Sequence, residues 1–264
     1  MATLHLIAGA GEVPARPTVR TIGLSDLADA LAKGIDDFLA MPSHAIFLCV
    51  IYPIVGLVVG RLTAGYDVLP LLFPLMAGFA LVGPFAAIGL YELSRRRERG
   101  LEVSWRNAFD VLRSPSFGAI AALGVLLMAL FLVWIAVAQS IYVANFGYAP
   151  AASIPDFVDD VFTTRAGWTL IVVGNGIGCL FAIVALTISV VSFPLLLDRD
   201  VGAAVAMLTS VRAVVANPIT MAIWGLLVAG LLAIGSLPFF IGLAVVLPVL
   251  GHSTWHLYRK VVAP

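Results

Sequence analysis

The stretch FGAIAALGVLLMALFLVWIAVAQSIY (Phe117–Tyr142) contains no charged residue and decides the class of fold. About 20 apolar residues in a helix span the hydrocarbon core of a bilayer, so this stretch is long enough to cross it. The whole chain is similar, with 61 % hydrophobic residues, 11 % charged residues and a mean hydropathy of +1.07. Soluble domains average about 45–50 % apolar and about 25 % charged residues. We therefore expect an all-α, polytopic membrane protein.

Five further stretches are long and apolar enough to cross a membrane, or nearly so. They run from about His44 to Gly60, Leu69 to Tyr91, Trp168 to Leu197, Ile219 to Gly235 and Leu237 to Tyr258. The last two are separated by a tight turn at GSLP (Gly235–Pro238). With Phe117–Tyr142, the sequence predicts six transmembrane helices.

The loops between these stretches carry an uneven distribution of positive charge. If the N-terminus lies in the cytoplasm, all but two of the 15 Lys and Arg residues fall on the cytoplasmic side. The exceptions are Arg61 and Arg165. Cytoplasmic loops of membrane proteins are enriched in Lys and Arg, so we expect both termini in the cytoplasm and the chain in a bacterial inner membrane. Residues 1–22 lack the pattern of a signal peptide and are predicted to form a mobile tail.

Residues 23–264 are predicted to form a single membrane domain of three repeats, about 23–100, 101–198 and 199–264. Each repeat begins with a short amphipathic segment that ends at a proline, Pro42, Pro115 or Pro218. The apolar stripes are Leu27, Leu31, Ile35 and Phe38; Trp105, Ala108, Phe109 and Leu112; and Val201, Val205, Leu208, Val211 and Val215. Such helices can lie in the membrane interface, and a proline favours a corner before the next helix. Chance similarity among apolar helices is the alternative interpretation.

Few polar residues lie in the middle of the predicted spans, and none of them is an acid or a base. Coupled transporters usually carry buried charges, so this absence argues against coupled transport. Asn175 lies between Gly174 and Gly178, a spacing of small residues that is typical of close helix packing. Asn175 is therefore expected either to bond a neighbouring helix or to contact a ligand.

The histidines near the predicted cytoplasmic surface are candidate ligands. His252 and His256 are four residues apart and share one helix face, a spacing that can hold a metal or a haem. His44 and Glu92 are predicted at the same depth. The alternatives are hydrated side chains at the interface or a polar cluster that binds lipid headgroups.

Arg95, Arg96 and Arg97 lie in the stretch LYELSRRRERG (Leu90–Gly100), which predicts a strong topological stop and could attract anionic lipid.

The predicted external loop, 143–167, shows a helix start at Ser153–Pro155 and an apolar stripe. Cys49 and Cys179 lie in apolar runs and are expected to be packing residues. The chain has zero formal net charge, so nothing suggests a nucleic-acid partner. It has no phosphate loop, HExxH or GxSxG motif, so we expect neither an enzyme nor a cofactor.

Several stretches resemble an uncharacterised proteobacterial family of predicted integral membrane proteins. They include GIDDFLAMPSHAIFLCVIYPIVGL (Gly34–Leu57), GPFAAIGLYELSRRRERGLEVSWRNAFDVLRSPS (Gly83–Ser116) and LPVLGHSTWHLYRK (Leu247–Lys260). Some members carry an automatic label of cytochrome c oxidase subunit I. A haem–copper core needs at least six histidine ligands, and only His44, His252 and His256 lie near the membrane here. The resemblance implies a membrane protein and no site residues.

Three functional hypotheses follow. The first is a non-catalytic accessory or scaffold subunit of a larger membrane complex, such as a respiratory one. The second is a carrier or binder of a lipid or small apolar molecule, using Asn175 and the polar residues Glu92 and Arg95–Arg97. The third is a haem or metal protein that uses His44, His252 and His256.

Overall fold

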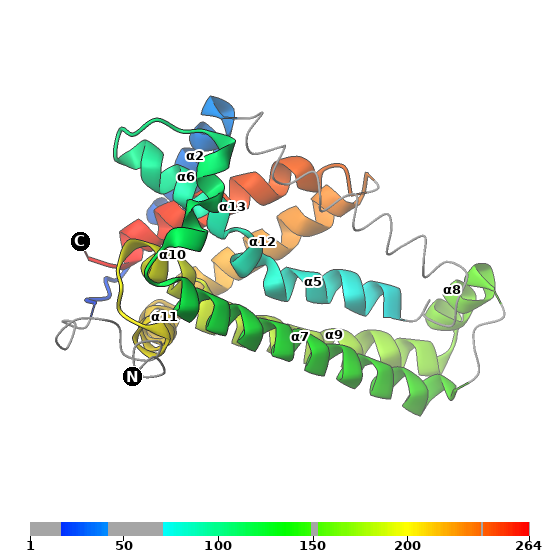
Figure 1. The fold of residues 1–264 in the computed structure, drawn as a ribbon. Coiled ribbons are helices and arrows are strands. Elements are labelled where there is room, and N and C mark those ends of the chain that lie inside the picture. The colour runs from blue at the N-terminus through cyan, green and yellow to red at the C-terminus, as the bar shows by residue number, and fades with distance from the viewer. Residues whose placement is uncertain (1–16, 42–70, 149–152, 239, 264) are drawn as a thin grey trace.

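The computed structural model describes residues 17–41, 71–148, 153–238 and 240–263. Every regular element in these ranges is a helix (Figure 1), which confirms the all-α class. The predicted first span, about His44–Gly60, lies outside the described residues, and so do Pro42, Cys49 and Arg61.

Four helical segments in the described part of the chain are long and apolar enough to cross a membrane. They are Phe73–Glu98, which includes α5 (Leu72–Ala86) and α6 (Ile88–Glu98); α7 (Phe117–Phe146); Arg165–Asp198, which includes α9 (Arg165–Ser189) and α10 (Ser192–Asp198); and α12 (Pro218–Ser236). They correspond to the predicted second, third, fourth and fifth spans. The predicted sixth forms a helix, α13 (Leu243–Val261), but is not among the four. Six spans and three repeats remain predictions.

The two longest segments are each interrupted once. Pro84 lies near the end of α5 and cannot donate a backbone hydrogen bond, which accounts for the break between α5 and α6 at Ala87. Between α9 and α10, the backbone N–H of Val191 donates to Oγ of Ser210 at 3.2 Å. Ser210 belongs to α11 (Ala203–Ala216), so a neighbouring helix satisfies the polar group at this break.

Trp134 of α7 holds the apolar bundle of α5, α7 and α9 together. Its Nε1 donates to the carbonyl oxygen of Pro74 at 2.9 Å, and its ring centroid lies 5.5 Å from that of Phe181. Gly178 gives this ring room, because a Cβ there would lie 3.0 Å from it. The predicted packing role of Gly178 is thus visible, whereas Cys179 beside it is exposed and not a packing residue inside the chain.

The far end of the bundle is closed by α8 (Ile154–Thr163), which begins where the external loop was predicted to start a helix. Oγ of Ser153 accepts a hydrogen bond from the backbone N–H of Asp156 at 3.2 Å and caps the helix. Phe157 packs its ring against Tyr142 and Phe146 at the end of α7. Part of the apolar stripe of α8 therefore covers the end of the bundle.

The three predicted amphipathic segments are helical. They form α2 (Leu24–Ala40), a 3-10 helix η2 (Trp105–Arg113), and α11. The predicted stripes, which could lie in the membrane interface, are divided in the structure. Their exposed residues are Ile35, Phe109, Leu112, Leu208 and Val215, and their buried residues include Leu27, Phe38, Ala108 and Val201. Small residues such as Ala30 and Gly34 in α2 and Ala206 in α11 are buried beside them and allow close approach of helix backbones.

Residues 17–22, predicted as part of a mobile tail, are bonded to the C-terminal segment. Val19 and Val262 form an antiparallel bridge, and the backbone N–H of Arg20 donates to the carbonyl of Val261 at 2.8 Å. Asn217, just before Pro218, also holds this segment: its Oδ1 accepts from the N–H of Ile22 at 2.7 Å, and its Nδ2 donates to the carbonyl of Arg20 at 3.0 Å. The predicted tail is thus anchored at its C-terminal end.

Candidate functional site

Most described charged residues gather at one end of the molecule, which we call the polar end. It is formed by α2, η2, the C-terminal ends of α6 and α10, and the C-terminal half of α13 (Figure 1). Helix α13 packs along α2 and also contacts α6, α10 and α12. Arg165, the described cation predicted on the other side, is the first residue of α9 and lies at the opposite end, next to α8.

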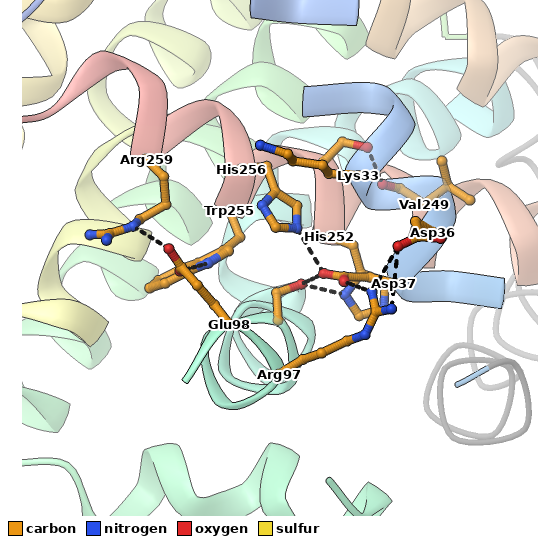
Figure 2. Close-up of polar contacts among 12 residues, drawn as sticks. Lys33, Asp36, Asp37, Arg97, Glu98, Val249, His252, Trp255, His256 and Arg259 are labelled. Carbon is orange, nitrogen blue, oxygen red and sulfur yellow. Dashed lines mark hydrogen bonds and ion pairs between the residues drawn. The ribbon is translucent and has the colours of Figure 1, made fainter. Parts of the chain in front are cut away.

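The centre of the polar end is a buried carboxylate, Asp37 of α2, whose residue surface is only 3 % exposed. Ser94 of α6 donates through Oγ to Asp37 Oδ2 at 2.6 Å. Nε2 of His256 donates to the same oxygen at 2.9 Å, and the guanidinium of Arg97 pairs with Oδ1. Figure 2 shows Arg97 and His256 reaching Asp37 from two other helices, α6 and α13. We call Asp37, Ser94, Arg97, His252 and His256 the Asp37 cluster.

Asp37 is held ionised by its partners. Burial alone would raise its pKa, but hydrogen bonds from His256, Ser94 and Arg97 outweigh it and lower the pKa to about 2. The carboxylate is therefore charged over the physiological pH range, and it ties α2, α6 and α13 together.

His252 is fully buried and belongs to the same network. Its Nδ1 lies 2.7 Å from Oγ of Ser94. Because Ser94 has one hydroxyl hydrogen and donates it to Asp37, Nδ1 of His252 must carry the hydrogen in their bond. Burial lowers the pKa of His252 to about 4, so the ring is neutral and Nε2 is unprotonated. Nε2 makes no hydrogen bond of normal geometry among the described residues, although the backbone of Leu90 lies near enough to the ring to raise its pKa slightly against the effect of burial.

The close approach of α2 and α13 depends on Gly34. A Cβ at this position would lie 2.6 Å from the backbone nitrogen of Ser253 and 2.8 Å from its Cα. Gly34 precedes Asp37 by three residues, so the two share one helix face. The glycine thus brings the Asp37 carboxylate within hydrogen-bonding distance of the histidine face of α13.

A second set of contacts links α13 to the ends of α6 and α10. Glu98 accepts hydrogen bonds from Nε1 of Trp255 at 3.0 Å and from Nε of Arg259 at 2.9 Å. The hydroxyl of Tyr258 donates to Asp198 Oδ2 at 2.8 Å, and burial raises the pKa of Tyr258. These contacts make the C-terminal half of α13 the structural centre of the polar end.

A pocket of about 310 Å³ opens beside this centre, between the ends of α6 and α10 and the start of α7. Its lining includes Glu92, Arg95, Arg113, Ser114, Ser116 and Asp200, and we call it the Glu92 pocket. Glu92 is 2 % exposed. Its Oε2 lies 2.8 Å from Nη2 of Arg95 but makes no hydrogen bond of normal geometry among the described residues. Nε of Arg95 is also buried without a partner there.

The candidate ligand residues from the sequence separate into different environments. Arg95 and Glu92 line the pocket, Arg97 joins the Asp37 cluster, and Arg96 pairs with Asp110 at 3.4 Å. Asn175 is exposed in α9 and donates to the carbonyl of Ile171 on its own helix at 2.8 Å, so it is not part of the polar end.

Of the histidine candidates, His252 and His256 do meet in one cluster, and His44 lies outside the described residues. No group of three or more His, Cys, Asp or Glu side chains in the described part of the chain is arranged to hold a metal. Asp37 is not among the candidate residues from the sequence, so sequence reasoning missed its central role. The usable signal was that Asp37 falls on the same face as Ala30 and Gly34.

The apolar spans and the single charged end define the class of the molecule as a helical integral membrane protein. Residues 72–198 match the family described as "Predicted integral membrane protein (DUF2189)". The match confirms the resemblance to an uncharacterised membrane protein family. It contains most of the Glu92 pocket but neither Asp37 nor α13. Comparisons with curated proteins and with solved structures gave no match.

Proposed function

We propose that this protein is a non-enzymatic membrane protein that binds the phosphate-bearing headgroup of a lipid in the Glu92 pocket. The observation that carries the proposal is the state of Glu92, an almost fully buried carboxylate whose Oε2 lies 2.8 Å from Nη2 of Arg95 but accepts no hydrogen bond of normal geometry from the described residues. Buried polar groups are nearly always hydrogen-bonded, so an exception beside a pocket favours a missing ligand. The arginines in the same lining supply groups that suit a phosphate.

The position of the pocket supports a lipid as the ligand. The pocket lies at the ends of three apolar segments, α5–α6, α7 and α9–α10, next to the charged residues of the polar end. Lipid headgroups occupy this boundary in a bilayer. The bias of Lys and Arg supports an inner membrane location with the polar end in the cytoplasm.

The six-span arrangement belongs to this proposal. Helix α2 and the C-terminal half of α13 both lie at the polar end, and α12 leads away from it. In this arrangement the chain returns through the predicted sixth span, about Leu237–Tyr258, and the first span is about His44–Gly60. The layout places the Asp37 cluster at the cytoplasmic end of the sixth span.

A second candidate function is an accessory subunit of a larger membrane complex. It is favoured by α12, in which only 17 % of the most apolar window is buried, against 56 % for Arg165–Asp198. Ile219, Leu226 and Leu237 are among the exposed side chains of this region. A helix of a partner protein would bury these apolar side chains in the complex, and lipid would cover them in its absence.

Native mass spectrometry after extraction in a mild detergent tests both functions. We expect one phospholipid per chain to remain bound, to be removable by harsher detergent and to rebind. Glu92→Gln should retain less lipid than the matched control Glu102→Gln, whose site is exposed. A chain that neither retains nor rebinds phospholipid refutes the headgroup function, and stable co-purifying subunits would support the accessory function instead.

A further inference from the structure

We propose that the Glu92 pocket selects phospholipids whose headgroup carries a primary amine, as phosphatidylethanolamine does. This inference rests on the proposed function and specifies its ligand. Such a headgroup is a zwitterion, with a phosphate and an ammonium group a few bonds apart. The pocket offers a separate set of partners for each charge.

The phosphate partners lie where η2 ends and α7 begins. Arg113 is exposed on the pocket lining and makes no ion pair or hydrogen bond within the described ranges. Ser114 lines the pocket beside it, three residues before Phe117, the first residue of a 30-residue helix. The backbone N–H groups of Ser116 and Phe117 are bonded to Ser114, so the positive partial charge and the next N–H groups of the helix N-terminus are what favour a bound phosphate.

The ammonium partners are the two lining carboxylates with the fewest partners among the described residues. Glu92 is paired with Arg95 alone, at 2.8 Å from its Oε2, and that oxygen accepts no hydrogen bond of normal geometry. Asp200 accepts one long hydrogen bond, from Ser116 Oγ at 3.3 Å. The other two lining carboxylates are occupied. Asp110 accepts from Asn107 at 2.9 Å, and Asp198 pairs with Arg99 at 3.1 Å.

The chemistry of the amine follows from this arrangement. A primary ammonium has three N–H donors that can bond the carboxylates of Glu92 and Asp200. A choline headgroup has none, because its nitrogen carries three methyl groups. A glycerol headgroup has no positive charge to balance the buried carboxylate. Binding either of them would leave Glu92 without a charged partner other than Arg95, which is costly inside a pocket.

The dimensions fit a headgroup rather than a whole lipid. At about 310 Å³ the pocket lies at the lower end of the range for ligand sites, about 300–1,000 Å³. The acyl chains would lie outside it, along the apolar surface of α7. Phe117 and Val125 are among the exposed apolar side chains there.

The test compares lipids with identical acyl chains on the delipidated full chain, by native mass spectrometry in detergent. The probes are phosphatidylethanolamine, phosphatidylcholine and phosphatidylglycerol, with soluble glycerophosphoethanolamine as a fourth. We expect phosphatidylethanolamine to bind about tenfold more tightly than the other two lipids, the value of one charged hydrogen bond. The soluble probe should bind more weakly than the lipid, because it buries no acyl chain.

Two variants test the phosphate partners and the ammonium partners of the pocket separately. Arg113→Gln should weaken all three lipids about tenfold, and its matched control is Arg165→Gln at the opposite end. Glu92→Gln should remove the preference for the amine, with Glu102→Gln as control. If Glu92→Gln does not fold, Asp200→Asn tests the same preference.

The outcomes distinguish the inference from the proposed function. Equal binding of the three lipids to the wild type overturns the amine selectivity and leaves headgroup binding intact. Absence of binding for every lipid overturns both. Binding of glycerophosphoethanolamine as tight as that of the lipid overturns the lipid as the source of the headgroup.

Discussion

Replacing Asp37 with Asn removes the charge on which Ser94, Arg97 and His256 converge. The folded environment lowers the pKa of Asp37 from 3.8 to about 2, so it favours the charged carboxylate over the neutral form. Each pKa unit corresponds to about 1.4 kcal/mol, which gives about 2 kcal/mol for this preference. Breaking a fully buried ion pair costs about 3–5 kcal/mol, but the side chain of Arg97 is 36 % exposed, so the lower figure applies. We expect Asp37→Asn to lower the free energy of unfolding by about 2–3 kcal/mol.

The neighbouring residue provides a matched control. Asp36 pairs with the same guanidinium at 3.3 Å, but its side chain is 74 % exposed. Exposed ion pairs contribute about 0–1 kcal/mol, so Asp36→Asn should change the unfolding free energy by less than about 1 kcal/mol. Reversible unfolding by sodium dodecyl sulfate in mixed micelles measures both variants. Equal losses for the two variants, or a loss below about 1 kcal/mol for Asp37→Asn, would refute the reasoning.

Three further predictions concern the same end of the molecule. The Asp37 carboxyl titrates near 3.8 when unfolded and near 2 when folded, so its stabilisation is complete above about pH 4 and is lost as the pH falls toward 2. Unfolding titrations across this window should show the wild type losing about 2 kcal/mol more than Asp37→Asn, and parallel curves would contradict this. Gly34→Ala should destabilise the protein by about 1–3 kcal/mol in the same assay because its Cβ meets the backbone of Ser253, whereas Gly176→Ala, with open space around it, should be neutral or stabilising. Asn217→Ala should release residues 18–22, because it removes the side-chain hydrogen bonds to Ile22 and Arg20. Amide hydrogen exchange should become faster in this segment and stay unchanged in α7, which serves as the control. Unchanged exchange at Ile22 would show that Asn217 does not anchor the segment.

The spans were predictable because the membrane imposes a simple rule. A backbone in lipid must satisfy its own hydrogen bonds, so a long apolar run forms a helix whatever its neighbours are. The run predicted at Phe117–Tyr142 is helical from Phe117 to Phe146. The start of α8 and the turn after α12 followed from equally local signals, a capping serine and the sequence GSLP.

The faces of the shorter helices were not predictable in this way. In α2 the apolar stripe was expected to lie in the membrane interface, but Leu27 and Phe38 of this stripe are buried in the protein and Ile35 is exposed. Gly34 and Asp37 are buried as well. The buried face is decided by the contact with α13, whose backbone at Ser253 leaves no room for a side chain at Gly34.

The sequence by itself determined the helical class, the four spans in the described residues and the gathering of positive charge on one side, because each depends on local composition. Tertiary structure alone decided that Asp37 is buried and Asp36, the next residue, is exposed. It also decided that Glu92 faces a pocket while Arg97, five residues later, joins a different cluster. The reason is physical: these environments depend on which helix packs against each face, and the partners of Asp37 on α13 are more than 200 residues away in the chain.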